Sequence, residues 1–240
     1  ITVDQSIMAD QVVTMKLASG SEIQYLSQWA IETKVCMSTF ANDESLKDLE
    51  RSDLTTHVYE GGFKVWECAR DLCDLIEAEQ ELVKGKDVIE LGCGAALPSI
   101  VALKEGARAV CMQDFNGAVI ACFTHENVKL NGVDDGRSQF IAASWDKMNE
   151  AIGEKSADVI LSSETIYNEN DYAALHDVIV HSLKEDGIAL IAAKMFYFGL
   201  SGCAPSFSDY VKNRGVMTVR EKKTIQASVP RVILELARVR

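Results

Sequence analysis

The chain has 240 residues, a length that allows one large domain or one domain with an N-terminal extension. Its formal net charge of −12 disfavours broad nucleic-acid binding, which needs a basic surface, and is compatible with a basic protein partner. Its seven cysteines include no Cys-x-x-Cys pair, which argues against a structural zinc site or a disulfide framework. Such cysteine usage favours a reducing compartment, so we expect a cytoplasmic protein, with the nucleus as an alternative location.

The N-terminal quarter differs in pattern from the rest of the chain. Two apolar runs, 12–17 and 22–26, flank a Ser-Gly-Ser turn and predict a pair of strands. The pattern over 42–49 predicts a short charged helix. We therefore assign residues 1–57 to an N-terminal accessory segment and residues 58–240 to the main domain.

From residue 65 onward, helical and strand patterns alternate. Apolar periodicity and capping signals predict helices over 65–82, 98–103, 116–130 and 171–183. Apolar runs predict strands over 87–91, 108–112, 138–143, 157–161 and 187–193, with a closing antiparallel pair over 217–222 and 232–236. Strands separated by helices form right-handed βαβ units. We therefore predict an α/β fold with a doubly wound, mostly parallel, Rossmann-like seven-stranded sheet and an antiparallel edge hairpin.

The strand over 87–91 is followed by two glycines one residue apart, Gly92 and Gly94. A strand, a glycine-rich turn and a helix make the geometry of a nucleotide site at the carboxyl end of a parallel sheet. Leu97 replaces the third glycine of the dinucleotide fingerprint, and no P-loop Gly-Lys-Ser/Thr follows. Glu90 fits S-adenosylmethionine, because the amino group and the sulfonium of that ligand are cationic. A glycine-rich turn of an unrelated α/β protein is the alternative.

Later strands also end in residues suited to parts of an adenosyl ligand. Asp114 lies about 20 residues beyond the glycines, where an acidic side chain accepts the ribose hydroxyls in nucleotide folds. Trp145 follows the third strand and could stack on adenine. Ser163 and Glu164 close the fourth strand, beside the transferred methyl group. Each residue alone has a structural explanation, but their joint order favours a methyltransferase that uses S-adenosylmethionine.

Several longer runs carry a resemblance to a known family. They are Ser52 to Leu54, Val58 to Cys68, Leu91 to Gly94, Gln113 to Asn116, Ser144 to Trp145, Ser162 to Asn168, Ala193 to Lys194 and Tyr197 to Gly199. On these runs the chain resembles the seven-strand S-adenosylmethionine-dependent methyltransferases. Within them it is similar to the histidine protein methyltransferases that modify a histidine of a large-subunit ribosomal protein. Ala96 departs from the family, which often has a third glycine there; we expect its methyl group to be tolerated but to narrow the methionine pocket.

The resemblance implies the site residues, the cofactor and the partner. It implies catalytic roles for Glu164, Tyr167 and Asn168, and no metal. It implies that S-adenosylmethionine is bound and leaves as S-adenosylhomocysteine. The partner would be a basic large-subunit ribosomal protein, and we expect a monomer with no membrane association and no direct nucleic-acid specificity. The implied donor-site residues are Trp66, Glu90, Gly92, Gly94, Asp114, Phe115, Asn116, Trp145 and Ser163.

Three other functions were weighed against histidine methylation. A protein lysine methyltransferase of the same fold is the nearest, because a carboxylate-x-x-tyrosine motif also occurs there. A nucleic-acid methyltransferase is disfavoured, because no Pro-Pro-aromatic signature follows the fourth strand and no basic stripe is visible. A non-catalytic adaptor that keeps the donor fold is disfavoured by the intact Gly92, Gly94, Asp114 and Trp145.

Overall fold

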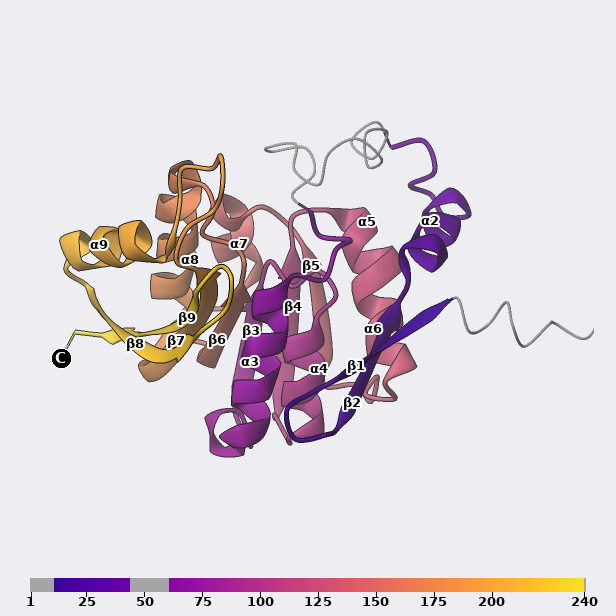
Figure 1. Cartoon of the computed structure of the whole chain (residues 1–240), viewed down its shortest axis with the longest axis horizontal. Helices are drawn as coiled ribbons and strands as arrows, with labels where there is room; N and C mark the ends of the chain where they lie inside the picture. Colours follow the sequence, from indigo (N-terminus) through magenta and orange to yellow (C-terminus); the bar gives the residue numbers. More distant parts are fainter. Residues whose placement is uncertain (1–10, 44–60, 240) are drawn as a thin grey trace, which may run out of the picture.

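The computed structural model describes residues 11–43 and 61–239. Within these ranges the chain forms a seven-stranded sheet with the order β5-β4-β3-β6-β7-β9-β8, and a separate two-stranded sheet of β1 and β2 (Figure 1). The strands are β1 (Val12–Lys16), β2 (Glu22–Leu26), β3 (Asp87–Leu91), β4 (Ala109–Asp114), β5 (Ser138–Ala142), β6 (Ala157–Ser163), β7 (Leu183–Lys194), β8 (Met217–Ile225) and β9 (Arg231–Arg238).

The large sheet has the predicted topology. Strands β5, β4, β3, β6 and β7 pair in parallel, whereas β9 pairs antiparallel with both β7 and β8. The predicted parallel sheet with an antiparallel edge is therefore confirmed. The strand order reverses at β3, which pairs with β4 on one side and β6 on the other. Open α/β sheets bind ligands at this switch point, outside the carboxyl ends of the strands.

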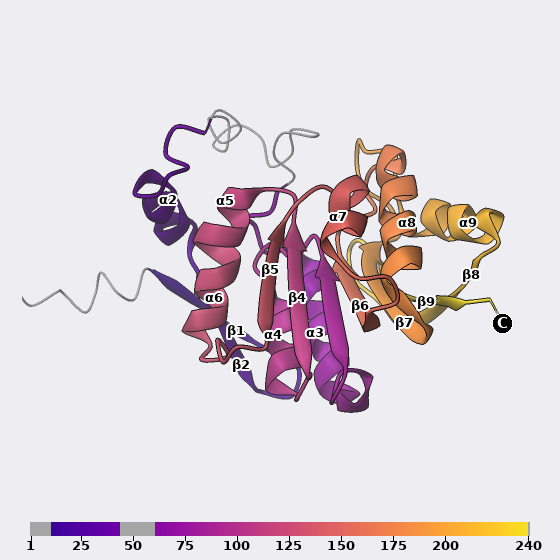
Figure 2. The ribbon, with the colours of Figure 1, turned by 180° about the vertical axis from the view of Figure 1, so that it is seen from behind.

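Helices cover both faces of the large sheet. Alternate strand residues point to opposite faces, so Val88 belongs to one apolar core and its neighbour Ile89 to the other. Figure 1 shows α3 and α4 in front of β3 and β4, and Figure 2 shows the same strands from behind. The helices are α2 (Gln28–Cys36), α3 (Glu67–Ala78), η2 (Gln80–Leu82), α4 (Leu97–Lys104), α5 (Gly117–Val119), η3 (Ile120–Thr124), α6 (His125–Leu130), α7 (Trp145–Ala151), η4 (Glu169–Asp171), α8 (Tyr172–Ser182) and α9 (Ala204–Arg214).

The described N-terminal segment packs onto the main domain. Its two predicted strands are confirmed as the antiparallel pair β1 and β2, and α2 follows them without having been predicted. Ile23 is buried in the same core cluster as α3 and α4. The Leu26 N–H donates to Asn127 Oδ1 at 2.9 Å. Most of the predicted helix over 42–49, and the proposed boundary after residue 57, lie outside the described residues.

The helix predicted over 116–130 is interrupted by a π turn, η3, between α5 and α6. The Thr124 hydroxyl lies 2.7 Å from the Gly94 carbonyl oxygen and 3.3 Å from that of Val119. The wider turn thus lets Thr124 contact the glycine loop as well as its own helix, and single π turns occur frequently at functional sites. In the described ranges, no helix is long and apolar enough to cross a membrane.

Candidate active site

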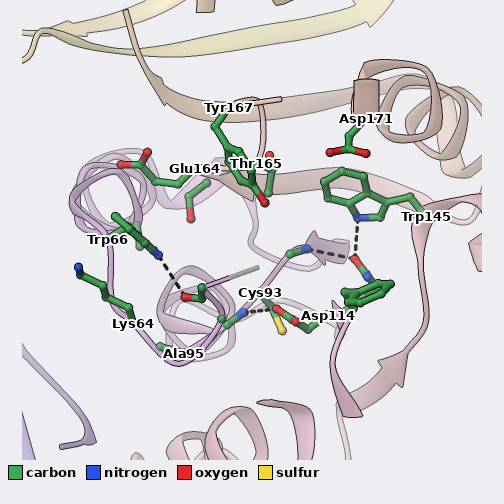
Figure 3. Close-up of a pocket in the computed structure, with 18 of the residues that line it drawn as sticks. Lys64, Trp66, Cys93, Ala95, Asp114, Trp145, Glu164, Thr165, Tyr167 and Asp171 are labelled. Carbon is green, nitrogen blue, oxygen red and sulfur yellow. Dashed lines mark hydrogen bonds between the residues drawn. The ribbon is translucent and has the colours of Figure 1, made fainter. Parts of the chain in front are cut away.

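A cavity of about 410 Å³ lies at the carboxyl ends of the central parallel strands (Figure 3). Its volume falls within the ~300–1,000 Å³ that is typical of small-molecule sites. Nine of the twelve predicted site residues line it. They are Trp66, Gly92, Gly94, Asp114, Phe115, Trp145, Ser163, Glu164 and Tyr167.

The glycine loop is shaped by close contacts within the protein itself. Gly92 and Gly94 have φ values of 65° and 48°, a left-handed conformation that side chains disfavour. A Cβ on Gly92 would lie 2.7 Å from the Thr165 side chain, and one on Gly94 would lie 3.0 Å from the Gly62 carbonyl oxygen. Both positions therefore require glycine, because the segments that contain Gly62 and Thr165 close over the loop.

Asp114 fastens the end of β4 to this loop. Its Oδ2 accepts the Gly94 N–H at 3.0 Å, and its Oδ1 accepts the Asn116 N–H at 3.2 Å. The side chain lines the cavity although the residue is only 6% exposed. A carboxylate has about four acceptor positions. Asp114 therefore holds the loop and also presents a carboxylate at the cavity.

Gln113 is a structural member of the site that the sequence analysis missed. Its Oε1 accepts the Gly92 N–H and the Trp145 Nε1–H, each at 3.0 Å, and its Nε2 donates to the Ala143 carbonyl at 2.6 Å. One amide therefore fixes the glycine loop, the indole wall and the end of β5. Figure 3 shows the hydrogen bond of the Trp145 indole. The sequence feature that could have identified Gln113 is its polar amide side chain in an otherwise apolar strand, directly before Asp114.

Glu90 does not line the cavity, contrary to the expectation that it faces the amino-acid end of the donor. It is fully buried, and its Oε2 accepts the Ser99 N–H at 2.9 Å in the first turn of α4. Burial raises the pKa of Glu90 to about 8, against the opposing effect of the Ser99 hydrogen bond. Ala96, the left-handed N-cap of α4, is also buried away from the cavity, so its methyl group does not narrow it.

Asn116 and Asn168 also lie outside the cavity lining. Asn116 is buried just beyond Asp114, at the start of α5. Asn168 caps η4, because its Oδ1 accepts the Asn170 N–H at 3.1 Å and its Nδ2 donates to Asp171 Oδ2 at 2.8 Å. In this structure Asn168 shapes the loop after Tyr167.

Glu164 is the buried member of a charge cluster on the opposite wall. The residue has a φ of 58° and is 8% exposed. Its Oε1 accepts the Cys68 N–H at 3.4 Å, in the first turn of α3, and lies 3.5 Å from Lys194 Nζ. Lys194 Nζ also lies 3.0 Å from Glu67 Oε2. Burial opposes the charge on Lys194, but the two carboxylates together raise its pKa above the ordinary value.

Trp66 separates this cavity from a second one of about 210 Å³. The two cavities share the lining residues Trp66, Glu164 and Tyr167. The indole Nε1–H donates to the Gly61 carbonyl at 3.2 Å, which holds the ring in place. Lys194 Nζ lies 5.4 Å from the ring centroid. Glu164 therefore lies at the junction between the two cavities.

The chain matches a family model described as "Lysine methyltransferase" over residues 47–197. It is 37% identical over 190 residues to a "Histidine protein methyltransferase 1 homolog" of Dictyostelium discoideum, which covers 78% of this chain and 61% of that protein. It is 32% identical over 259 residues to the protein of the same description in Rattus norvegicus, which covers 95% of this chain and 71% of the relative. The chain thus spans 61% and 71% of the length of these two relatives.

A solved structure shares the fold. The "ribosomal protein L11 methylase" of Lactobacillus delbrueckii subsp. bulgaricus superposes with a TM-score of 0.56 at 19% identity, covering 74% of this chain and 81% of the other. The family-model match includes every described residue that lines the larger cavity. By these matches, the chain belongs to the histidine protein methyltransferase family, within the wider family described as lysine methyltransferases.

Proposed function

We propose that the chain is an S-adenosylmethionine-dependent protein methyltransferase that transfers a methyl group to a ring nitrogen of a histidine side chain. The observation that carries this proposal is Glu164, a buried carboxylate held by Lys194 and by the N-terminus of α3 at the junction of the two cavities. When bound, S-adenosylmethionine supplies a methyl group that its sulfonium already activates.

The larger cavity has the side chains that this donor needs. Asp114 would accept the ribose hydroxyls, and Trp145 and Phe115 would flank the adenine ring. The backbone of the loop between Gly92 and Gly94 would follow the methionine part. The fit rests on a cavity of small-molecule size that combines an acceptor carboxylate with two aromatic walls.

The chain's own residues would align the acceptor and stabilise its new charge. A neutral imidazole has a lone pair near pH 7, whereas a lysine amine must first lose a proton. Transfer of the methyl group from the bound donor to the acceptor nitrogen would leave positive charge on the imidazole ring, which the surrounding side chains would stabilise. Glu164 would accept the N–H of the other ring nitrogen, and Tyr167 would pack against the ring. Alignment at near-contact distance supplies much of the rate.

Lysine methylation is the alternative, favoured by the description of the matching family model. The two acceptors predict different pH profiles, because the unperturbed pKa is about 6.5 for imidazole and about 10.4 for lysine. Single-turnover transfer to a histidine should reach a plateau above about pH 7.5, whereas transfer to an unassisted lysine should keep accelerating toward about pH 10.

We propose a basic large-subunit ribosomal protein as the substrate, and a monomeric enzyme in the cytoplasm or nucleus. The net charge of −12 supports a basic partner. The test incubates the full chain and isotopically labelled S-adenosylmethionine with proteins extracted from large ribosomal subunits. We expect peptide mapping to place the label on a histidine. Label on lysine, with a rate that still climbs steeply above pH 8, would support the alternative.

A further inference from the structure

The second cavity lies next to the proposed acceptor position. Among the described residues its lining is mostly apolar or aromatic, and its volume of about 210 Å³ is roughly half that of the donor cavity. This volume lies below the ~300 Å³ at which small-molecule sites usually begin. The pocket therefore suits one side chain rather than a second small ligand. Its described lining is Trp66, Glu164, Tyr167, Lys194, Phe196, Tyr197, Phe198, Leu200 and Val229.

Charge also restricts which side chains the second cavity can bind. The two charged side chains in its described lining are Glu164 and Lys194, and their charged atoms lie 3.5 Å apart. Lys194 is paired with both Glu164 and Glu67, and Glu164 is the group proposed to hold the acceptor imidazole. A charged side chain that entered the pocket would lose water without gaining a free counter-charge, which is costly. An apolar or aromatic side chain avoids this cost.

The outer rim of the pocket exposes three apolar side chains close together in the sequence. Phe196, Phe198 and Leu200 are 41%, 80% and 42% exposed, on the segment between β7 and α9. The rings of Phe196 and Phe198 meet edge to face at 5.1 Å, so each restricts the other. Apolar patches of this kind frequently mark binding sites.

Because the two cavities share a wall, a side chain that occupies the second cavity must lie close to the acceptor. Trp66, Glu164 and Tyr167 line both cavities, so a side chain in the second pocket enters beside the acceptor. An extended chain rises about 3.3 Å per residue, which limits the occupant to the acceptor's near neighbours.

We propose that the second cavity binds a large apolar or aromatic side chain of the substrate polypeptide, within two residues of the methylated histidine. This inference rests on the proposed function and adds a sequence preference to it. The exposed rings of Phe196 and Phe198 and the Leu200 side chain form the outer contact, and Trp66 forms the inner wall shared with the acceptor.

The test uses blocked peptides of the form Gly-Gly-His-Gly-Gly in which phenylalanine replaces one glycine at a time. A second set has alanine in place of histidine. Binding to the full chain saturated with S-adenosylhomocysteine is measured by NMR titration, and methyl transfer by mass spectrometry. We expect phenylalanine at one position to tighten binding about tenfold in both sets, the effect of burying part of an aromatic side chain.

Two substitutions test whether the second cavity causes the preference for phenylalanine. Phe198→Ala and Leu200→Ala should each reduce the phenylalanine preference several-fold without changing donor affinity. Met37→Ala, at the exposed apolar C-cap residue of α2, should leave the preference intact. The inference is overturned if no phenylalanine peptide binds more tightly than its glycine parent, or if the preference survives both substitutions.

The two peptide sets separate this inference from the proposed function. Phenylalanine-dependent binding that is equal with histidine and with alanine, without methylhistidine in any product, would support the pocket and contradict histidine methylation. Methylhistidine formed without any phenylalanine preference would support the proposed function and overturn the pocket.

Discussion

The proposed donor wall and the proposed acceptor wall of the candidate site are built in different ways. On the donor wall, Gln113 and Asp114 join the ends of β3, β4 and β5 through short hydrogen bonds to backbone and indole groups. On the acceptor wall, one cluster of charges around Glu164 borders exposed aromatic rings after β7. A donor molecule of constant shape can be bound by polar groups in fixed positions. A polypeptide substrate brings its own side chains, so loops that carry apolar surface suit it better.

The largest expected effect comes from the acceptor wall. Glu164→Gln keeps the shape of the side chain and removes the charge that would stabilise an imidazolium. We expect the single-turnover rate to fall about 10²-fold, the lower end of the range for acid–base groups, with donor affinity unchanged. Glu169→Gln, at an exposed carboxylate on η4, is the control. A normal rate in Glu164→Gln, or a large loss of donor affinity, would contradict the assignment of Glu164 to the acceptor wall.

The donor wall should respond in the opposite way. Asp114→Ala removes the acceptor of the Gly94 N–H and the proposed acceptor of the ribose hydroxyls. Hydrogen bonds to charged groups contribute about 1.5–3 kcal/mol, so donor affinity should fall about 10- to 100-fold. Calorimetric titration with S-adenosylhomocysteine measures this loss, with Asp186→Ala at an exposed position as the control. Unchanged affinity would remove Asp114 from the donor site.

Lys194 sharpens the comparison, because it lines the second cavity and not the larger one. Lys194→Met leaves Glu164 without its ammonium partner. We expect about a tenfold lower rate at saturating donor, which corresponds to about 1.4 kcal/mol. Lys194→Arg keeps the positive charge and should be faster than Lys194→Met, which a purely steric role would not predict. The control Lys147→Met, at an exposed residue, should have no effect on the rate. A tenfold change in donor affinity instead would assign Lys194 to the donor wall.

Glu90 should affect stability more than activity. Its pKa rises from an ordinary 4.5 to about 8 on burial, so the folded chain binds more protons than the unfolded chain between these values. The contribution of Glu90 to the unfolding free energy is complete below about pH 4.5 and declines as pH rises toward about 8. Glu90→Gln should flatten this decline, and the exposed Glu81→Gln should not. Urea unfolding between about pH 5 and 8.5 measures both slopes; equal slopes in wild type and Glu90→Gln would exclude this account.

Features outside the local sequence pattern account for the differences between prediction and structure. Asn116, Asn168 and Glu90 are residue types suited to ligand contacts. The side chains of Glu90 and Asn168 instead accept hydrogen bonds from backbone N–H groups at the start of a helix and in a turn. The helix α9 was missed because Cys203, an unusual N-cap residue, starts it.

The sequence by itself determined that residues after the parallel strands gather at one edge of the sheet. Apolar runs separated by helical patterns predicted the parallel strands, and parallel strands bring their carboxyl ends to one edge. Gly92, Asp114, Trp145 and Glu164 therefore had to meet there. Only the tertiary structure decided what surrounds them. The contact of Glu164 with Cys68, 96 residues away, and its pairing with Lys194 depend on strand order and on the direction of each side chain. Local periodicity does not encode either property, because both arise when distant segments pack against each other.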